Sequence, residues 1–340
     1  MQSLKRFFNP SMVDLAIDLG TQNLLISDKL QVIYNEATLV AQTDSTRKGD
    51  QFVFGSKAME VERSSAPGYS VHRLLENGVI VDMDRTSEFL ERVFRPIVKR
   101  PRVLITHPLD ISDIERRAFR MVAENAGAAK VVLIPEPVAF VAGICSKFRD
   151  RESLLMIDVG AGISEAVLFS RGRVVSFASN RVGGHELEKA LISYARRVRK
   201  YEISQSASIA ILNKIAYERN DAFLKRIPLL GKKLETGLPE AIFFEVKEVE
   251  KVLEPLFLKI VETALQVLDD YPPDMSEKII EEGVFFTGGA SQFPRIKELL
   301  AERTTVSVVD DSQPLLGVAR GEIQVLHDKG LLEFLANEYD

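Results

Sequence analysis

The chain has 340 residues with 46% hydrophobic content, which is enough to bury substantial cores and long enough for two domains. Its formal net charge is −5, from 44 basic and 49 acidic residues, which argues against nucleic acid as the primary partner. The single cysteine, Cys145, excludes an intrachain disulfide and favours a reducing cytoplasm.

The first eight residues combine apolar and basic side chains. Leu4, Phe7 and Phe8 fall at helical spacing beside Lys5 and Arg6, a pattern typical of an interfacial membrane anchor. No apolar run approaches the ~20 residues that span a bilayer, and the long apolar stretch of a secretory signal is missing. We therefore expect a cytoplasmic protein that is peripheral at the membrane. A frayed terminus is the alternative interpretation.

The first half of the chain alternates strands with helices. Three short apolar segments separated by turn residues, 13–17, 24–26 and 32–34, predict a strand meander. Ile114, Ala118, Met121 and Val122 fall on one stripe of a capped helix that begins after Ser112, and we expect that stripe to face the core. The other elements that the pattern predicts here are a helix over 86–98 and strands over 102–106 and 131–134.

The second half continues the alternation. The predicted helices cover 185–200, 206–216, 247–268 and 294–303, and buried strands cover 166–169 and 284–286. Residues 223–244 hold two prolines and two glycines and predict a small strand-and-turn insertion. Strands that alternate with helices indicate a mainly parallel α/β sheet, to which the opening meander adds antiparallel strands.

One pattern occurs twice in the chain. An apolar strand, an Asp-x-Gly turn and a second strand appear first around Asp18 and Gly20 and again around Asp158 and Gly160. A single Asp-x-Gly turn is common in hairpins, but two with matching surroundings indicate an internal duplication. We expect two domains of similar fold, each of which contributes one turn.

Two such turns suit a nucleoside triphosphate. Their glycines let backbone N–H groups approach phosphate oxygens, and their carboxylates can hold Mg²⁺ through water. We therefore expect a magnesium site at Asp18 and Asp158. The glycine signatures of P-loop and dinucleotide-binding proteins are missing, and the four histidines show no metal-ligand spacing.

These motifs resemble those of the superfamily of actin, sugar kinases and heat-shock chaperones. Residues 18–21 and 158–164 resemble its two phosphate motifs, 287–290 its adenosine motif, and 136–139 and 319–321 its two connecting helices. Residues 101–105, 115–118 and 181–184 are similar to the bacterial MreB family. The resemblance covers nearly the whole chain. It implies an actin-like, ribonuclease H-like α/β fold with two duplicated lobes and a nucleotide cleft between them.

The resemblance also implies domain boundaries. Domain I would comprise 1–140 and 318–340, with a small subdomain at about 34–80. Domain II would comprise 141–317, with a small subdomain at about 185–245.

Functional roles follow from the same resemblance. Glu136 would orient the attacking water and, with Asp158, carry catalysis, although an acid at a helix start also complements the helix dipole. The residues that would bind ATP are Asp18, Gly20, Thr21, Gln22, Asn23, Asp158, Gly160, Ala161, Gly162, Ser164, Gly183, Gly184, Gly288, Gly289 and Ala290.

Four positions depart from the family pattern. Ile163 replaces a threonine hydroxyl that senses phosphate or positions water, and His185 replaces an aspartate. Ile209 and Leu212 align where MreB presents a Glu and a Lys toward the nucleoside. These departures leave open whether ATP is hydrolysed.

The resemblance implies a bacterial actin-like cytoskeletal protein. It would bind Mg-ATP, act as a slow ATPase coupled to polymerisation, and form filaments at the inner membrane. Membrane proteins of the cell-shape machinery would be its partners, and patterned cell-wall synthesis its role. One alternative is a hydrolysis-deficient actin-like scaffold. Another is a small-molecule kinase of the same fold, which would need a catalytic Asp and insertions that shape a sugar pocket.

Overall fold

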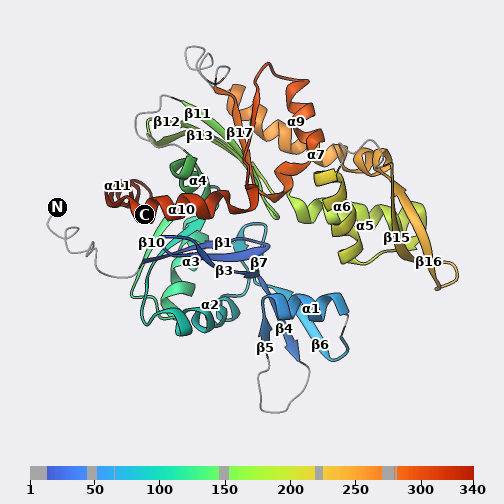
Figure 1. The fold of residues 1–340 in the computed structure, drawn as a ribbon, viewed down its shortest axis with the longest axis horizontal. Coiled ribbons are helices and arrows are strands. Elements are labelled where there is room, and N and C mark those ends of the chain that lie inside the picture. Colours follow the sequence, from blue (N-terminus) through green and yellow to red (C-terminus); the bar gives the residue numbers. More distant parts are fainter. Residues whose placement is uncertain are drawn as a thin grey trace. The chain divides into compact units, whose positions relative to one another are not determined.

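The computed structural model describes residues 14–43, 52–64, 66–144, 153–218, 225–269, 279 and 282–340. The chain forms two compact units (Figure 1). Unit 1 comprises Met1–Ser146 and Val318–Asp340, and unit 2 comprises Lys147–Gly317. Leu4, Phe7 and Phe8, the predicted membrane anchor, lie outside the described residues.

Unit 1 is built on a five-stranded mixed sheet with the order β10-β9-β1-β2-β3. Strands β1, β9 and β10 run parallel, and β1, β2 and β3 form an antiparallel meander, as predicted. The strand bounds are β1 Asp14–Leu19, β2 Asn23–Ser27, β3 Val32–Ala37, β9 Arg102–His107 and β10 Lys130–Pro135.

Two capped helices accompany this sheet. Helix α2 (Met83–Ile97) begins three residues before the predicted start because the Asp82 side chain accepts a hydrogen bond from the Arg85 N–H at 2.9 Å. Helix α3 (Asp113–Asn125) has the predicted capping box between Ser112 and Glu115.

The predicted core stripe of α3 is partly wrong. Ile114 is 81% exposed and Met121 is 44% exposed, whereas Phe119, Val122 and Ala123 are buried. The helix is therefore rotated from the predicted orientation, and the large aromatic ring of Phe119 takes the core-facing position. Burying such a ring removes more apolar surface from water than burying an isoleucine.

Several elements of unit 1 had no counterpart in the predictions. A three-stranded sheet of order β5-β4-β6 packs with α1, and β7 and β8, which have two residues each, form a hairpin. Asn77 and Gly78, which join β7 to β8, both have positive φ, as that tight turn requires. The bounds of the elements without a prediction are β4 Leu39–Thr43, β5 Phe52–Phe54, α1 Ser56–Ser64, β6 Tyr69–Arg73, β7 Leu75–Glu76, β8 Val79–Ile80 and α11 Lys329–Tyr339.

Helices α4 (Glu136–Ile144) and α10 (Gly317–His327) contain residues 136–139 and 319–321, which the sequence analysis expected to be helical.

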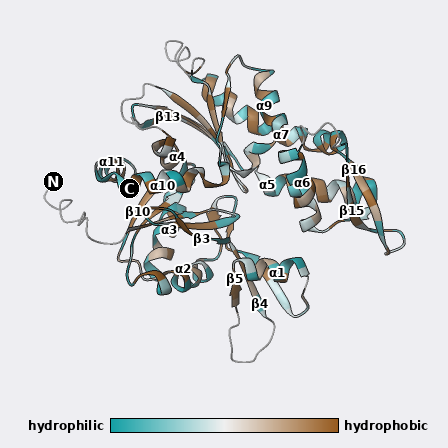
Figure 2. Cartoon of the chain, in the orientation of Figure 1, coloured by the Kyte–Doolittle hydropathy of each residue, from teal (hydrophilic) through white to brown (hydrophobic). Residues whose placement is uncertain are grey.

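Unit 2 repeats the strand topology of unit 1. Its sheet has the order β13-β12-β11-β17-β18, in which β11, β12 and β13 are antiparallel and β11, β17 and β18 are parallel. The strands are β11 Leu154–Val159, β12 Ser164–Ser170, β13 Arg173–Asn180, β17 Val284–Thr287 and β18 Val308–Asp310. Many residues of the strands in both large sheets are apolar and buried, and these strands are coloured as hydrophobic in Figure 2.

The remaining elements of unit 2 are mostly helices. The predicted helix over 185–200 is α-helical only to Tyr194 and continues as a π-helix, η2. The predicted insertion forms the hairpin of β15 and β16, to which β14 adds a third strand in the order β14-β15-β16. The bounds are α5 Gly184–Tyr194, η2 Ala195–Arg199, β14 Tyr201–Glu202, α6 Gln205–Glu218, β15 Arg226–Lys233, β16 Pro239–Glu245, α7 Val246–Asp269, η3 Gly289–Gln292, α9 Pro294–Ala301 and η4 Pro314–Leu316.

Candidate functional site

The first Asp-x-Gly turn, in unit 1, is closed by a backbone hydrogen bond and is held by further hydrogen bonds from residues outside the turn. The Gly20 N–H donates to the Asn23 carbonyl at 3.0 Å. Buried Thr38 donates its hydroxyl to the Gly20 carbonyl at 2.8 Å and its N–H to the Gln22 carbonyl at 2.9 Å. The Thr21 hydroxyl accepts from the Gly78 N–H at 3.0 Å. The turn is therefore fixed in shape before any ligand binds.

Asp18 has a buried carboxyl neighbour that the sequence analysis missed. In the parallel register Asp18 lies opposite Thr106, whose hydroxyl donates to Glu322 Oε1 at 3.0 Å. Glu322 is fully buried, and burial raises its pKa well above the ordinary value, with a further increase from nearby Asp18. Its Oε2 has no hydrogen-bond partner within the described residues. In the sequence, Glu322 was marked only by its position directly after the motif at 319–321.

Glu136 lies at the same edge of the sheet as Asp18. Thr106 is paired with both Asp18 on β1 and Ile134 on β10, and Glu136 follows two residues later as the first residue of α4. Parallel strands present their carboxyl ends at one edge, where α/β sheets bind ligands. The structure thus brings Glu136 and the first turn to one edge of unit 1.

Two glycines let helices α4 and α10 approach closely in unit 1. A Cβ atom on Gly321 would lie 1.8 Å from the Ala139 carbonyl oxygen, and one on Gly143 would lie 2.6 Å from the Gly321 Cα. No larger side chain fits at either position without moving a helix. Glu322, the next residue of α10, lies near Asp18 of the first turn.

The second turn, in unit 2, has the same closing bond as the first. The Gly160 N–H donates to the Ile163 carbonyl at 2.9 Å. The Gly184 and His185 N–H groups donate to the carbonyls of Gly160 and Ala161 at 3.0 and 2.8 Å. Gly184 and His185 therefore support the turn through their own N–H groups. A Cβ on the neighbouring Gly183 would lie 2.6 Å from two of the turn's carbonyl oxygens, so Gly183 allows this close packing.

Three N–H groups of the second turn remain available. Those of Ala161, Gly162 and Ile163 donate to no protein acceptor in the part of the chain that the structure describes. Successive N–H groups in a turn form a concave site for an anion. Ser164, by contrast, uses its hydroxyl within the fold, where it donates to the Val182 carbonyl at 2.6 Å.

Asp158 lies against the predicted adenosine motif. Gly288 has φ +84°, and a Cβ there would lie 2.2 Å from Asp158 Oδ1. That oxygen has no hydrogen-bond partner among the described residues. Burial and, to a smaller extent, the charge of Asp311 together raise the pKa of Asp158 from 3.8 to about 6. Gly289 opens the 3₁₀ turn that follows, in which Ala290 is buried.

The two units share a carboxyl arrangement. Asp158 lies opposite Thr287 in the parallel register, as Asp18 lies opposite Thr106. The Thr287 hydroxyl donates to Asp311 Oδ2 at 3.1 Å, as that of Thr106 donates to Glu322. Each turn aspartate therefore has a second carboxyl group nearby that is held by a threonine of the adjacent strand.

The departures from the family pattern have structural consequences in unit 2. Ile163 is only 7% exposed, so its side chain belongs to the interior. Leu212 joins the hydrophobic core, while Ile209 is half-buried. His185 is buried at the start of α5.

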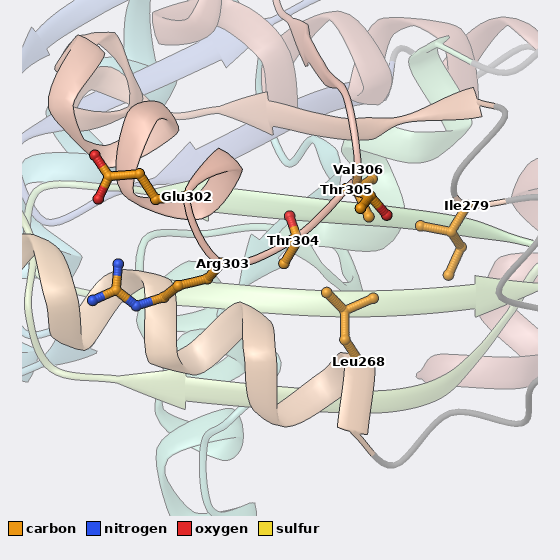
Figure 3. A pocket seen from close by; sticks show the side chains of 7 residues that line it. All are labelled: Leu268, Ile279, Glu302, Arg303, Thr304, Thr305 and Val306. Carbon is orange, nitrogen blue, oxygen red and sulfur yellow. The ribbon is translucent and has the colours of Figure 1, made fainter.

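Two hollows lie apart from these turns. One of about 530 Å³ in unit 2 is lined by Leu268, Ile279 and residues 302–306 (Figure 3). Another of about 420 Å³ in unit 1 lies at the opposite ends of β9 and β10 from Thr106, beside Arg102 and Lys130. Neither is lined by a predicted nucleotide-binding residue.

Comparison with known proteins identifies relatives over almost the full length. The profile of the family described as MreB/Mbl protein matches residues 12–333. The cell shape-determining protein MreB of Escherichia coli strain K12 is 30% identical over 327 residues, which cover 94% of each chain.

Two solved structures share the fold. MreB5 of Spiroplasma citri bound to ADP superposes with a TM-score of 0.87 at 23% identity, over 96% of this chain and 98% of that one. The MamK double helical filament superposes with a TM-score of 0.77 at 16% identity, over 94% and 99%. The predicted actin-like fold is thus confirmed, and the chain belongs to the MreB/Mbl family.

Proposed function

We propose that this chain binds Mg-ATP with its two Asp-x-Gly turns, one from each unit, and polymerises into filaments that help to shape the bacterial cell. The duplicated turn carries the proposal, because Gly20 and Gly160 close the two copies with the same backbone bond. The N–H groups of residues 161–163, which donate to no acceptor in the described part of the chain, suit phosphate oxygens. The similar Spiroplasma protein was solved with ADP, and the similar MamK forms a filament.

Magnesium fits the chemistry of the turn residues. Mg²⁺ usually binds through one or two carboxylates, water and the substrate's phosphates, so a cluster of three protein ligands is not needed. No such cluster occurs in the described ranges. Asp158 offers an oxygen that has no hydrogen-bond partner among the described residues, and Asp18 is its counterpart in unit 1. The bound ion would neutralise phosphate charge.

Glu136 would hold and orient the attacking water for ATP hydrolysis. The chain would then be a slow ATPase, and its hydrolysis would be coupled to polymerisation. A scaffold that binds nucleotide without hydrolysis is the second candidate. The buried Ile163 side chain favours it, because no hydroxyl at that position can reach a phosphate or a water.

We place the filament at the cytoplasmic side of the inner membrane, with membrane proteins of the cell-shape machinery as partners. Leu4, Phe7 and Phe8 would provide the anchor. Among the described residues, no helix is both long and apolar enough to cross a bilayer. The relatives are named cell shape-determining proteins, which supports a role in cell shape. We propose that this chain contributes to cell shape by patterning cell-wall synthesis.

Calorimetry of Mg-ATP binding tests the proposal. Asp18→Asn should abolish binding, whereas Asp84→Asn, an exposed aspartate on α2, should leave it unchanged. The absence of binding by the unaltered protein would refute the nucleotide site. Sedimentation with a non-hydrolysable ATP analogue should show filaments. Phosphate release no faster than that of Asp158→Ala would favour the scaffold over the ATPase.

A further inference from the structure

The outer face of the β15–β16 hairpin presents apolar side chains to solvent. Leu230 is 72% exposed and Phe243 is 42% exposed, and Pro228 and Ala241 beside them are also exposed. Alternate residues of the same strands, such as Phe244, point the other way into the core of unit 2. The hairpin is therefore apolar on both faces, although only one face is needed for the fold.

The residues of this outer face are arranged as complementary pairs. Pro228 lies opposite Phe243 and Leu230 lies opposite Ala241, so each pair joins a large side chain to a small or flat one. Because the large member alternates between the strands, the face has two ridges and two hollows on opposite diagonals.

Charged pairs border the apolar centre at both ends. Arg226 pairs with Glu245 across the strands at 3.3 Å, and Lys232 pairs with Glu202 of β14 at 3.7 Å. A compact apolar centre with a charged rim is the usual anatomy of a protein interface.

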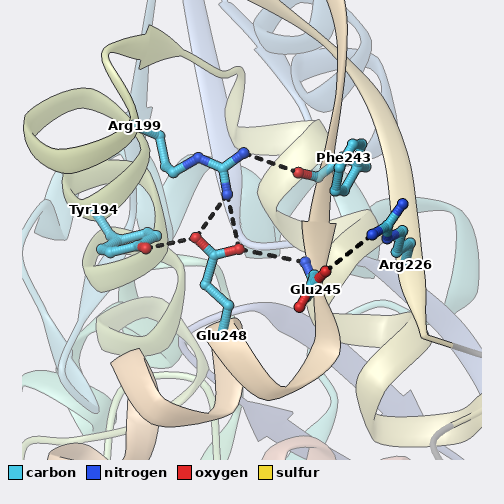
Figure 4. Close-up of polar contacts among 6 residues, drawn as sticks. All are labelled: Tyr194, Arg199, Arg226, Phe243, Glu245 and Glu248. Atoms are coloured by element: carbon cyan, nitrogen blue, oxygen red, sulfur yellow. Dashed lines mark hydrogen bonds and ion pairs between the residues drawn. The ribbon is translucent and has the colours of Figure 1, made fainter.

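A polar network holds the hairpin in place (Figure 4). Glu248 of α7 accepts from Tyr194 at 2.5 Å and from Arg199 at 2.7 Å. Arg199 also donates to the Phe243 carbonyl at 3.3 Å and lies over the Phe244 ring. The Arg226 guanidinium covers the Phe243 ring at 4.5 Å. The face is thus presented as a pre-formed surface.

We infer that this face pairs with the same face of a second copy of the chain. The two copies would be related by a twofold axis that lies between the two faces and runs parallel to the strands, above the midline between β15 and β16. This axis exchanges the two strands. It places Leu230 over Ala241 of the second copy and Phe243 over Pro228 of the second copy, so ridges fill hollows. It also brings Arg226 to Glu245 of the second copy.

Charge selects this axis over the alternative. A twofold axis across the strands would place β15 over β15 in reverse, and Arg226 would then face Lys232 of the second copy. Two like charges brought together at an interface rim are unfavourable. The axis along the strands avoids this and pairs opposite charges instead.

The inference rests on the proposed self-assembly for the choice of a second copy as partner. It adds a lateral contact, which would join two filaments or two free subunits side by side. The contact uses neither Asp-x-Gly turn, so it can be measured without nucleotide.

Cross-linking tests the geometry. On a Cys145→Ser background, Leu230→Cys and Ala241→Cys proteins are mixed and treated with a short bismaleimide. The cross-linked product should exceed that of Leu230→Cys mixed with Leu30→Cys by about tenfold, since Leu30 is exposed in unit 1. Equal yields would overturn the inference. A strong product from Arg226→Cys mixed with Lys232→Cys would overturn the chosen axis, which keeps these residues roughly 20 Å apart along the strands.

Sedimentation velocity tests the energetics. Leu230→Glu should weaken lateral association about tenfold or more, because it buries a charge at the apolar centre, whereas Leu30→Glu should not. Equal thermal melting of the variants checks folding. If Leu230→Glu abolishes pairing while Mg-ATP binding and single filaments persist, the inference holds. If the unaltered protein pairs without binding ATP, only the nucleotide proposal fails. If it stays monomeric at every concentration and no cross-link forms, the inference fails.

Discussion

Asp158 and Gly288 lie so close together that each restricts the other. A hydrogen is the only substituent that fits at Gly288, because a Cβ would lie 2.2 Å from the Asp158 carboxyl oxygen. The repeated turn predicted Asp18 and Asp158 as site residues. Glu322 and Asp311 could not be predicted in this way, since a single carboxylate in a sequence does not reveal whether it will be buried beside another.

Replacing Gly288 by alanine should destabilise the protein through both strain and collision. Positive φ alone costs alanine about 1–2 kcal/mol, and the collision should add about 1–3 kcal/mol. Gly68→Ala is the matched control, since Gly68 also has positive φ but nothing within 4 Å of a Cβ. Urea unfolding measures both. Equal losses of unfolding free energy in the two variants would show that the contact with Asp158 relaxes freely.

Asp158 should lower stability as the pH rises. Its pKa is raised to about 6 in the folded chain, so the protonated carboxyl favours the folded state. That contribution is fully present below the unfolded value of 3.8 and is lost as the pH rises through about 6. The loss amounts to about 3 kcal/mol for a shift of about two units. Urea unfolding in metal-free buffer at several pH values measures it.

Asp158→Asn is the matched comparison, because it keeps the shape and removes the titration. His107 titrates in the opposite sense, since burial lowers its pKa to about 4 and its contribution is lost as the pH falls. Because His107 is present in both proteins, the difference between their pH profiles isolates Asp158. A difference that does not change between about pH 4 and pH 7 would contradict the shifted pKa.

At the scale of elements, strong periodicity predicted the strands and helices of both large sheets. Helix α3 shows the limit of this reasoning, because apolar residues at Ile114 and Met121 satisfied the spacing and yet remain exposed. Strands β4 to β8 are short, two to five residues each, and no periodicity can be recognised over such lengths. The π-helix could not be predicted either, since residues 195–199 read as ordinary helix.

The crossing of α4 and α10 should not tolerate a methyl group at Gly321. The Cβ would lie 1.8 Å from the Ala139 carbonyl, so the helices must separate, and we expect a loss of about 3 kcal/mol. Gly330→Ala on α11, where the nearest atom is 3.4 Å from the Cβ, should instead be neutral or stabilise by up to about 1 kcal/mol. Denaturant unfolding of both variants tests this, and similar effects would contradict the tight crossing.

At the scale of the whole molecule, the duplication was the most informative feature of the sequence. It predicted two similar units, and the strand order of one is repeated in the other. The small three-stranded sheets differ between the units, β5-β4-β6 in one and β14-β15-β16 in the other, and nothing in the repeat predicted them. The apolar outer face of the second became visible only when register and exposure were known.

The predicted membrane anchor can be tested on the full chain. Burying a phenylalanine stabilises an interfacial segment by roughly 1.5–3 kcal/mol, so Phe7→Asp with Phe8→Asp should reduce binding to anionic vesicles by about a hundredfold. Leu30→Asp, an exposed apolar residue in unit 1, serves as the control. Vesicle co-sedimentation measures binding, and unchanged binding by the double variant would exclude the anchor.

The π-helix at Ala195–Arg199 has a consequence for how this region tolerates insertions and deletions. A π turn usually arises when one extra residue enters an α-helix. Deleting a single codon, such as that of exposed Val198, would let the α-helix continue but would rotate its end by about 100° relative to α7. Arg199 would then leave Glu248 and the Phe243 carbonyl. Relatives in which this segment is an uninterrupted α-helix should therefore anchor their hairpin by other side chains.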